Sequence, residues 1–226
     1  MLLFIIRHGD PIYNPDSLTP KGHEQAKALV RRFTVHGLDR IYSSPMIRAQ
    51  QTAAPTAEAL GLPVNIEKWC SEDWAYREMS IPTAGGGRTW YFRRDINEIR
   101  ADGLTAEPKL EAVRAGIKRI GDSSDEFMAR HGYVREGDFY RIEKPNDERV
   151  AVFCHEGFGC TWMAHLLSVP TQQFWTTHYL THSAVSVFQF ENDPAGFTYP
   201  KMLAFSDISH ILGTDLPYEH SNSIPM

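Results

Sequence analysis

The feature that most constrains the fold is an apolar segment near the start of the chain that ends abruptly in polar residues. Residues 2–6 are all apolar, and Arg7, His8 and Gly9 follow them directly. A short apolar run without alternation is typical of a strand buried on both faces, as in a parallel α/β sheet. Ligands of such sheets bind beyond the carboxyl ends of the strands. The segment therefore predicts a central strand that carries Arg7 and His8 to a binding edge.

Arg7 and His8 are suited to phosphoryl transfer. Neutral imidazole can attack phosphorus, and guanidinium matches phosphate oxygens through paired hydrogen bonds. Gly9 would let the backbone turn sharply and leave space beside the ring. These residues alone are equally consistent with a strand that ends in a polar turn, so the interpretation depends on the rest of the chain.

A second stretch repeats this pattern late in the chain. Residues 149–154 predict a buried strand that ends at His155, and glycines and a helix carrying Trp162 and Leu166 follow. A histidine here could also be a helix cap or a core residue. Its place at the same kind of strand end as His8 favours a role in the site.

A third stretch, residues 43–53, adds an arginine. Ser44 is expected to cap a helix and Pro45 to begin it, which puts Arg48 in or just past the first turn. Helix N-termini attract anions through unpaired N–H groups and the helix dipole. A lone helical arginine is more often a surface residue, but the preceding strand, expected at residues 39–42, favours a place in an anion site.

The remaining pattern alternates helices and strands. A helix capped by Thr19 should begin at Pro20 and end at Gly37, and a third strand is expected at residues 64–66. The last two strands are expected at residues 185–190 and 197–205.

Residues 68–148 differ in composition, with many aromatic and charged residues and a run of three glycines. Here we expect helices over residues 89–100 and from Pro108 onward, and a hairpin over residues 133–142. This region is interpreted as an insertion over the carboxyl edge of the sheet, acting as a lid within a single domain spanning residues 1–226.

Composition excludes several classes of protein. The formal net charge of -5 gives no sign of a nucleic-acid partner, and the apolar runs are too short for a membrane span. No basic region precedes the first apolar run, so no secretory signal is expected. The three cysteines cannot all pair within one chain, and reduced thiols in a cytoplasmic protein are the simplest interpretation.

Other motifs fail on inspection. His155-Glu156 is not a zinc motif because Gly159 stands where a second histidine would be needed, and the chain has no Walker A loop. Cys154 is adjacent to His155, but neighbouring strand residues point to opposite faces. Cys154 is therefore expected in the core.

Taken together, these residues resemble an ordered family pattern. The chain is similar to the histidine phosphatase superfamily, the phosphoglycerate mutase-like group, over its first sixty residues and residues 149–167. The matching residues are Arg7-His8-Gly9, Leu18-Thr19, Gly22, Gln25-Ala26, Ser43-Ser44-Pro45, Arg48-Ala49, Thr52-Ala53 and His155.

The resemblance implies an α/β fold of three layers, α/β/α, with a mostly parallel sheet. It implies that His8 is the phosphorylated nucleophile, and that Arg7, Arg48 and His155 hold the phosphoryl group. Asn14 resembles an asparagine of the family that also reaches the phosphate.

The family's general acid lies shortly after the third strand. Glu72 matches best by position, and Asp73 and Glu78 are rivals because no glycine fixes the register. Two further departures are Tyr13, where mutases tend to have tryptophan, and Glu156, where the family usually has glycine. The Glu156 carboxylate would line the substrate site and could lower its affinity for anions.

These observations favour a phosphomonoesterase that acts through phosphohistidine on a small phosphorylated metabolite. A carboxylic acid with a raised pKa would protonate the leaving alkoxide and then activate water. Because arginines supply the positive charge, no metal or cofactor is expected. A phosphoglycerate mutase-type transferase is the alternative, disfavoured because the tail has no basic or glycine-rich gating segment, and a non-catalytic phosphate-binding module ranks last.

Overall fold

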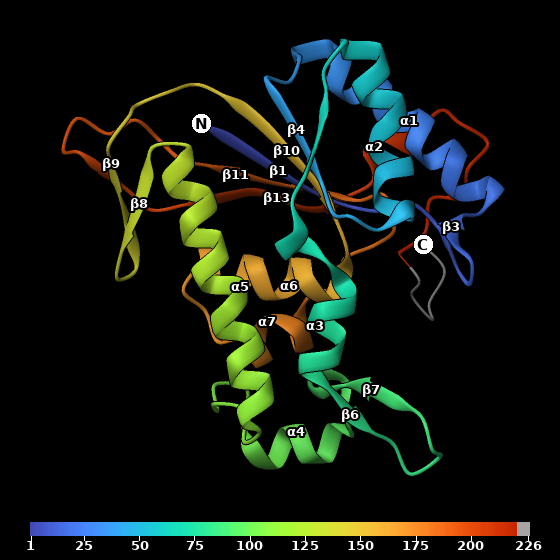
Figure 1. Cartoon of the computed structure of the whole chain (residues 1–226), viewed down its shortest axis with the longest axis vertical. Coiled ribbons are helices and arrows are strands. Elements are labelled where there is room, and N and C mark those ends of the chain that lie inside the picture. Colours follow the sequence, from blue (N-terminus) through green and yellow to red (C-terminus); the bar gives the residue numbers. More distant parts are fainter. Residues whose placement is uncertain (221–226) are drawn as a thin grey trace.

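A mixed sheet of six strands forms the centre of the molecule in the computed structural model, which describes residues 1–220 (Figure 1). Its spatial order is β13-β11-β1-β10-β4-β5. The strands are β1 (Leu2–Arg7), β4 (Arg40–Ser43), β5 (Val64–Ile66), β10 (Arg149–Cys154), β11 (Val185–Gln189) and β13 (Lys201–Asp207). Strands β1, β10, β4 and β5 are mutually parallel, and β11 runs antiparallel between β1 and β13. The predicted α/β class with a mostly parallel sheet is confirmed.

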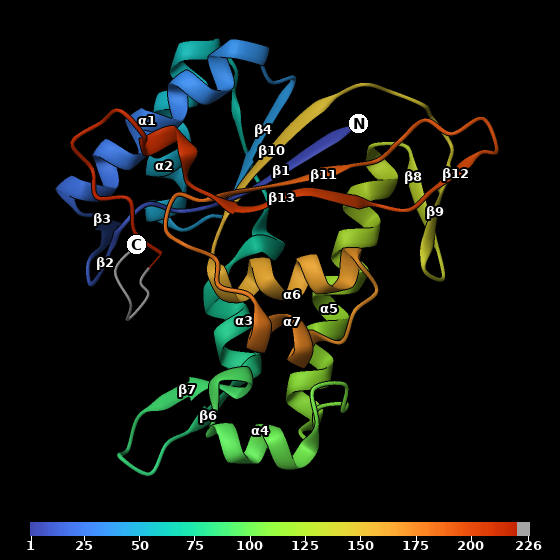
Figure 2. The ribbon, with the colours of Figure 1, turned by 180° about the vertical axis from the view of Figure 1, so that it is seen from behind.

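Helices cover both faces of this sheet. Helices α1 (Pro20–His36) and α2 (Ile47–Leu60) lie on one face. On the other face, below the strands in Figure 2, α6 (Glu156–Leu166) packs on β1. Helices α3 (Glu72–Met79), α5 (Glu111–Arg130) and α7 (Thr171–Thr177) pack in turn against α6. The expected three layers are therefore present.

The helix that begins at Pro20 is as predicted. The Thr19 hydroxyl accepts a hydrogen bond from the backbone N–H of Gly22 at 3.0 Å, and Gly37, with φ of 74°, ends the helix. The loop before it contains a small hairpin that was not predicted, formed by β2 (Pro11–Tyr13) and β3 (Asp16–Leu18).

The segment between β5 and β10 holds most of the departures from prediction. Its shorter elements are η1 (Lys68–Cys70), β6 (Ser80–Pro82), β7 (Arg88–Trp90), η2 (Tyr91–Arg93), α4 (Ile96–Asp102), β8 (Tyr133–Glu136) and β9 (Phe139–Ile142). The predicted hairpin is confirmed as β8 and β9.

The predicted helix over residues 89–100 is wrong in its first half. Residues 88–90 form strand β7, paired with β6, and the helix begins only at Ile96. The β-branched and aromatic pair Thr89-Trp90 suits a strand, and the Asp95 side chain caps α4 by accepting from the N–H of Asn97.

The C-terminal part completes two sheets. Strand β12 (Phe197–Thr198) adds to the β8–β9 hairpin, and η3 (Ser209–Ile211) packs on α1. Residues 212–220 contain no helix or strand. From the sequence, no basic or glycine-rich gating segment is expected in the tail. That prediction also covers residues 221–226, which lie outside the described part of the chain.

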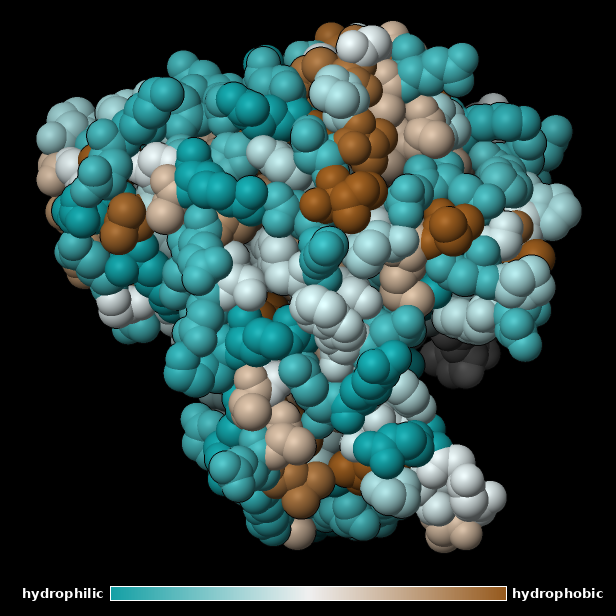
Figure 3. All heavy atoms as spheres, in the orientation of Figure 1, coloured by the Kyte–Doolittle hydropathy of each residue, from teal (hydrophilic) through white to brown (hydrophobic). Residues whose placement is uncertain are grey.

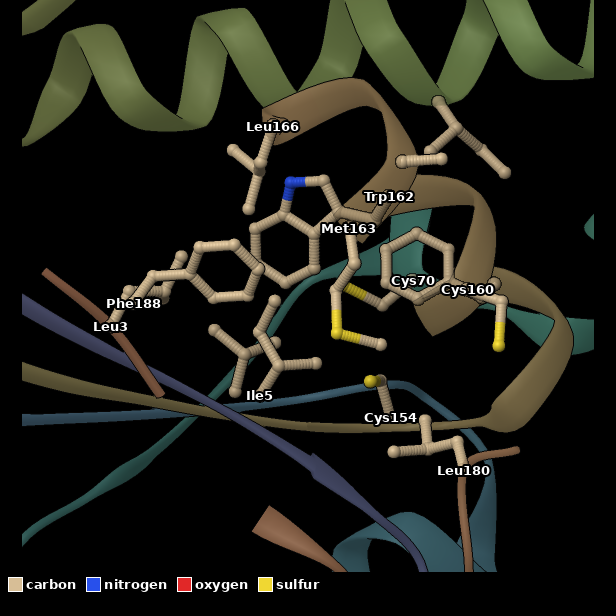
Figure 4. Close-up of a cluster of buried hydrophobic side chains, with 14 of the residues drawn as sticks. Leu3, Ile5, Cys70, Cys154, Cys160, Trp162, Met163, Leu166, Leu180 and Phe188 are labelled. Atoms are coloured by element: carbon tan, nitrogen blue, oxygen red, sulfur yellow. The ribbon is translucent and has the colours of Figure 1, made fainter. Parts of the chain in front are cut away.

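The core lies on both sides of β1. Leu3 and Ile5 belong to the hydrophobic cluster under α6, whereas Ile6 belongs to the cluster under α1 and α2. Figure 4 shows the first cluster, in which Trp162 and Met163 of α6 lie over the strand. This burial of β1 on both faces explains its continuous apolar run.

The three cysteines are buried in the same cluster as free thiols (Figure 4). Burial raises the pKa of the Cys154 thiol far above its ordinary value. The structure therefore confirms Cys154 as a core residue, as expected from the alternation of strand side chains.

The outer surface is mainly hydrophilic on the face in Figure 3. Its hydrophobic residues gather over the edge strand β5, where Ile66 is 45% exposed. None of the helices described is long and apolar enough to span a membrane.

Candidate active site

The structure brings together the two predicted strand ends. Arg7 is paired with Cys154 across β1 and β10, and the N–H of His8 donates to the carbonyl oxygen of Cys154 at 2.9 Å. The rings of His8 and His155 consequently lie 5.1 Å apart, centroid to centroid. Two histidines separated by almost 150 positions in the sequence thus share one edge of the sheet.

His8 is held as a neutral imidazole. Its Nδ1 lies 2.7 Å from the carbonyl oxygen of Gly9. A carbonyl only accepts, so Nδ1 carries the proton and Nε2 is the free base. Burial, and then the neighbouring His155, Arg7 and Arg48, hold the pKa of His8 well below its ordinary value. The Nε2 atom can therefore act as a nucleophile at neutral pH.

Gly9 is required for a reason other than the one expected. A Cβ at this position would lie 2.6 Å from the carbonyl oxygen of Gly22, so the space is occupied by the start of α1 rather than left open beside the ring. The N–H of Gly9 also donates to the hydroxyl of Thr52 on α2, at 3.0 Å. These contacts fix the loop that follows His8 against two helices.

Arg7 is buried and held by three partners. Its guanidinium donates to the carbonyl oxygen of Leu180, contacts Nε2 of His182 at 2.8 Å, and lies 3.2 Å from the carboxylate of Glu156. Burial and the Arg7 charge lower the pKa of His182 to about 3, so His182 is a neutral acceptor. Nothing in the sequence pattern pointed to His182.

Arg48 lies in the first turn of α2, as predicted, although the start of the helix differs. Helix α2 begins at Ile47, and the Ser44 hydroxyl accepts from the N–H of Met46 at 3.3 Å rather than from an N–H of the helix. Asp16 binds the N-terminus of the helix instead. Its carboxylate accepts from the backbone N–H of Ile47 at 2.6 Å and from the guanidinium of Arg48 at 2.7 Å. Ser44 and Pro45 therefore precede the helix rather than cap and begin it, because Asp16 from β3 supplies the acceptor.

His155 completes the group. It is fully buried, and its Nε2 contacts the Ser44 hydroxyl at 2.7 Å. Burial, with Arg48 and Arg7, lowers its pKa well below the ordinary value.

Three buried nitrogen atoms at this edge have no hydrogen-bond partner in the described part of the chain. They are Nε of Arg7, Nε of Arg48 and Nδ1 of His155. Buried polar atoms are normally satisfied, and an exception calls for a missing partner. Arg7 and Arg48 also line the cavity described below, whereas His155 is not among its lining residues.

Glu72, the first residue of α3, lines the same cavity. Its two carboxylate oxygens accept from the N–H groups of Gly157 and Phe158, each at 2.8 Å, so it binds the N-terminus of α6. Burial nevertheless raises the pKa of Glu72 to about 7. A carboxyl group with this pKa can give up and take back a proton near neutrality.

The structure separates the rival acids. Asp73 also lines the cavity, with an exposed side chain. Glu78 does not line it, and both of its oxygens are bound by Arg119 at 2.6–3.0 Å. Glu72 is thus the candidate whose surroundings match the chemistry, with Asp73 as its neighbour.

Asn14 is not among the residues that line the cavity. It is exposed in the turn between β2 and β3, whereas the adjacent Tyr13 lines the cavity and lies 5.3 Å from the Arg48 guanidinium. Contact between Asn14 and a phosphoryl group therefore stays a prediction.

The cavity has a volume of about 400 Å³. Residues 68–148 were expected to cover this edge of the sheet, but Tyr76, Trp90, Arg93 and Tyr179 of the far wall were not singled out, because no spacing or motif marks them. The residues that line the cavity are Arg7, His8, Tyr13, Arg48, Glu72, Asp73, Tyr76, Trp90, Arg93, Glu156 and Tyr179. Most of the far wall comes from the aromatic-rich segment between β5 and β10.

Glu156, the first residue of α6, lies between two arginines. One carboxylate oxygen is 3.2 Å from Arg7, and the other is bound by Arg93 from η2. The guanidinium of Arg93 also lies 5.8 Å from the ring centroids of both Trp175 and Tyr179. Within residues 1–220, no group of three or more His, Cys, Asp or Glu side chains is placed to hold a metal ion.

Comparison with known proteins identifies the class. The family model described as "Histidine phosphatase superfamily (branch 1)" matches residues 3–199, and the chain therefore belongs to this superfamily of phosphatases. The resemblance found in the sequence and the assignment to a histidine phosphatase family hydrolase are both confirmed.

Particular relatives carry narrower names. A protein of Hydrogenobacter thermophilus named "Putative phosphoserine phosphatase 2" is 33% identical over 206 residues, covering 87% of this chain and 93% of the relative. A phosphoserine phosphatase from Entamoeba histolytica, solved with 3-phosphoglyceric acid, has a TM-score of 0.64 at 21% identity, covering 93% of this chain and 99% of that one. A mycobacterial glucosyl-3-phosphoglycerate phosphatase has a TM-score of 0.61 at 18% identity, covering 90% and 98%. The two solved structures support the fold.

Proposed function

We propose that this chain is a phosphomonoesterase that acts on a small phosphorylated metabolite through a phosphohistidine at His8. The observation that carries the proposal is the setting of His8, a buried neutral imidazole whose Nε2 is left as the free base. Arg7 and Arg48 line the same cavity as His8, and the ring of His155 lies 5.1 Å from the ring of His8, centroid to centroid.

The residues suffice for a two-step reaction. His8 Nε2 attacks phosphorus while the buried cations stabilise charge on the oxygens that do not leave. Glu72, protonated at the start, donates its proton to the departing alkoxide. As a carboxylate it then removes a proton from the water that hydrolyses the phosphohistidine, and the site returns to its first state.

The segment between β5 and β10 is proposed to act as a lid over this site. It contributes Glu72, Tyr76, Trp90 and Arg93 to the cavity wall. Relatives named for phosphoserine and for glucosyl-3-phosphoglycerate support a small phosphorylated metabolite as the substrate, with the lid residues making the choice among them.

The test is covalent trapping. Brief acid-free denaturant quench with labelled substrate should capture a phosphoryl group on His8 that is labile to acid and stable to base. His8→Ala should abolish both the label and turnover, whereas His36→Ala, on the last turn of α1, should leave both intact. Label on Cys154 or on a serine would contradict the proposal. Phosphate exchange between positions of phosphoglycerate, without release, would instead indicate a mutase.

A further inference from the structure

The carboxylate of Glu156 occupies a place where a phosphate site would not be expected to hold one. It lies 3.2 Å from Arg7, which is itself a candidate phosphate ligand, and only 12% of its side chain is exposed. On its other side it binds Arg93, whose side chain is 43% exposed. The Glu156–Arg93 pair therefore forms the part of the cavity wall next to the phosphoryl position.

The charges of the cavity are balanced before any substrate enters. The guanidinium groups of Arg7, Arg48 and Arg93 share the cavity with the carboxylates of Asp73 and Glu156 and with the protonated Glu72 of the proposed mechanism. Asp16 pairs with Arg48 and supplies the third carboxylate, so the three guanidinium charges are matched without Glu72. A phosphate monoester dianion would add negative charge to this wall unless the rest of the substrate carried a positive group.

The position of the pair determines where that positive group would bind. An ammonium bound to Glu156 would be separated from Arg7 by a single carboxylate group. A short carbon chain would then be long enough to join this ammonium to a phosphate ester bound at Arg7. Arg93 lies beyond it, supported by the rings of Trp175 and Tyr179. Once released by Glu156, its guanidinium would be free to bind a carboxylate.

From this geometry we infer that Glu156 and Arg93 form a subsite for the amino and carboxylate groups of an O-phosphoamino acid. The substrate's ammonium takes the place of Arg93 on Glu156, and its carboxylate binds Arg93. The inference rests on the proposed phosphomonoesterase function and names the class of its substrate.

Exchange of the Glu156–Arg93 pair for contacts with the substrate keeps both side chains paired with an opposite charge. One ion pair within the protein is replaced by two between protein and substrate, so neither charge is left unpaired. An analogue that keeps the carboxylate but lacks the amino group draws Arg93 toward that carboxylate and offers Glu156 no cation in exchange, so repulsion by Glu156 disfavours it. An analogue without the carboxylate leaves the Glu156–Arg93 exchange half complete.

Four esters test the two contacts separately. O-phosphoserine carries both groups, 3-phosphoglycerate replaces the amino group with hydroxyl, O-phosphoethanolamine lacks the carboxylate, and ethyl phosphate lacks both. We expect kcat/KM for O-phosphoserine to exceed that for 3-phosphoglycerate and for O-phosphoethanolamine, each by roughly tenfold or more.

Two variants assign the contacts to residues. Glu156→Gln should reduce the preference for O-phosphoserine over 3-phosphoglycerate to within about threefold of equality. Arg93→Met should reduce the preference for O-phosphoserine over O-phosphoethanolamine to within about threefold of equality. Ratios measured within one variant do not depend on the fraction of active protein or on any effect through Arg7. Glu136→Gln, which removes an exposed ion pair with Arg141 outside the cavity, should keep both ratios at wild-type values.

The inference is overturned if the wild-type enzyme hydrolyses these esters without preferring O-phosphoserine, or if Glu156→Gln lowers all four rates equally. The latter result would mean that Glu156 serves only to position Arg7. Failure of the proposed function has a different signature, namely no phosphoenzyme and no hydrolysis of any ester, p-nitrophenyl phosphate included.

Discussion

At the scale of single residues, two opposing effects set the proton affinity of Glu72. The N–H groups of Gly157 and Phe158 favour its carboxylate, yet burial outweighs them and raises the pKa to about 7. Because the folded protein keeps this proton to a higher pH than the unfolded chain, Glu72 makes the fold less stable as pH rises from its ordinary pKa toward about 7. The same proton is the one that an alkoxide leaving group needs.

Replacing this acid should matter in proportion to the basicity of the leaving group. Glu72→Gln should slow phosphorylation of His8 far more with an alkyl phosphate than with nitrophenyl phosphate, by about a hundredfold in the ratio of rates. In the wild type, phosphorylation by the alkyl ester should fall as pH rises above about 7. Single-turnover kinetics are the appropriate measurement, since slow dephosphorylation could hide the effect at steady state.

Matched carboxylates on the same helix provide the controls. Glu78→Gln should lower the two rates equally or not at all, because Glu78 is bound to Arg119 outside the cavity. Equal losses for both esters in Glu72→Gln would remove Glu72 from the acid role, and a differential loss in Asp73→Asn would transfer that role to its neighbour.

Residues that follow a strand could be placed from the sequence, because a strand end is visible as a change from apolar to polar. Arg7, His8 and His155 were found in this way. His182 and Arg93 could not be found, because their place depends on packing between distant segments and no local pattern marks it. The resemblance to a family supplied Glu72, although three carboxylates in one helix left the register open.

At the scale of elements, the start of α6 depends on the absence of a side chain at Gly157. A Cβ there would lie 2.4 Å from two ring atoms of Trp90 and 3.0 Å from a carboxylate oxygen of Glu72. Gly157 thus lets the lid segment and the acid approach the helix N-terminus closely. The contact joins the proposed lid to the carboxyl edge of the sheet.

Gly157→Ala should therefore be destabilising although alanine is the better helix former. Overpacking of this kind typically costs about 1–3 kcal/mol, more than the gain of about 1 kcal/mol from helix propensity. Urea unfolding followed by tryptophan fluorescence would measure the difference. Gly159→Ala is the matched control in the same helix, because its nearest neighbour is a flexible methyl group of Leu180 at 3.2 Å. Equal stability of the two variants would show that Trp90 moves aside freely.

Trp90 also belongs to the element that was predicted wrongly. Trp90 belongs to β7, which pairs with β6 and packs its ring against Trp175 at 5.1 Å, whereas the local pattern favoured a helix over residues 89–100. Long buried strands and well-capped helices were predictable because their signals lie within one segment. Strands β6 and β7 pair with each other and have three residues each, too few for an alternating pattern to be visible in the sequence.

At the scale of the whole molecule, positive charge is concentrated at one cavity of a protein whose net charge is negative. The formal net charge is -5, yet three arginines line one cavity. In the proposed mechanism the arginines take the role that metal ions have in kinases, namely to neutralise charge on the transferring phosphoryl group.

Phosphatase activity should accordingly survive excess chelator. Rates measured with and without ethylenediaminetetraacetate should agree, and added Mg²⁺ should not raise them. A loss of activity that a divalent cation restores would mean that the groups stabilising charge have been misassigned. An alkaline phosphatase that requires zinc, treated in the same way, serves as the positive control for the chelator.

The three thiols in the core have a consequence for how the opening of this fold could be followed. Cys70, Cys154 and Cys160 belong to the buried cluster shared by the sheet and α6, each at most 1% exposed, and burial raises the pKa of each thiol. Reaction with a thiol reagent needs both access and a thiolate. Each cysteine can therefore be labelled only from a state in which this cluster has opened, and the protein carries a natural reporter of that opening.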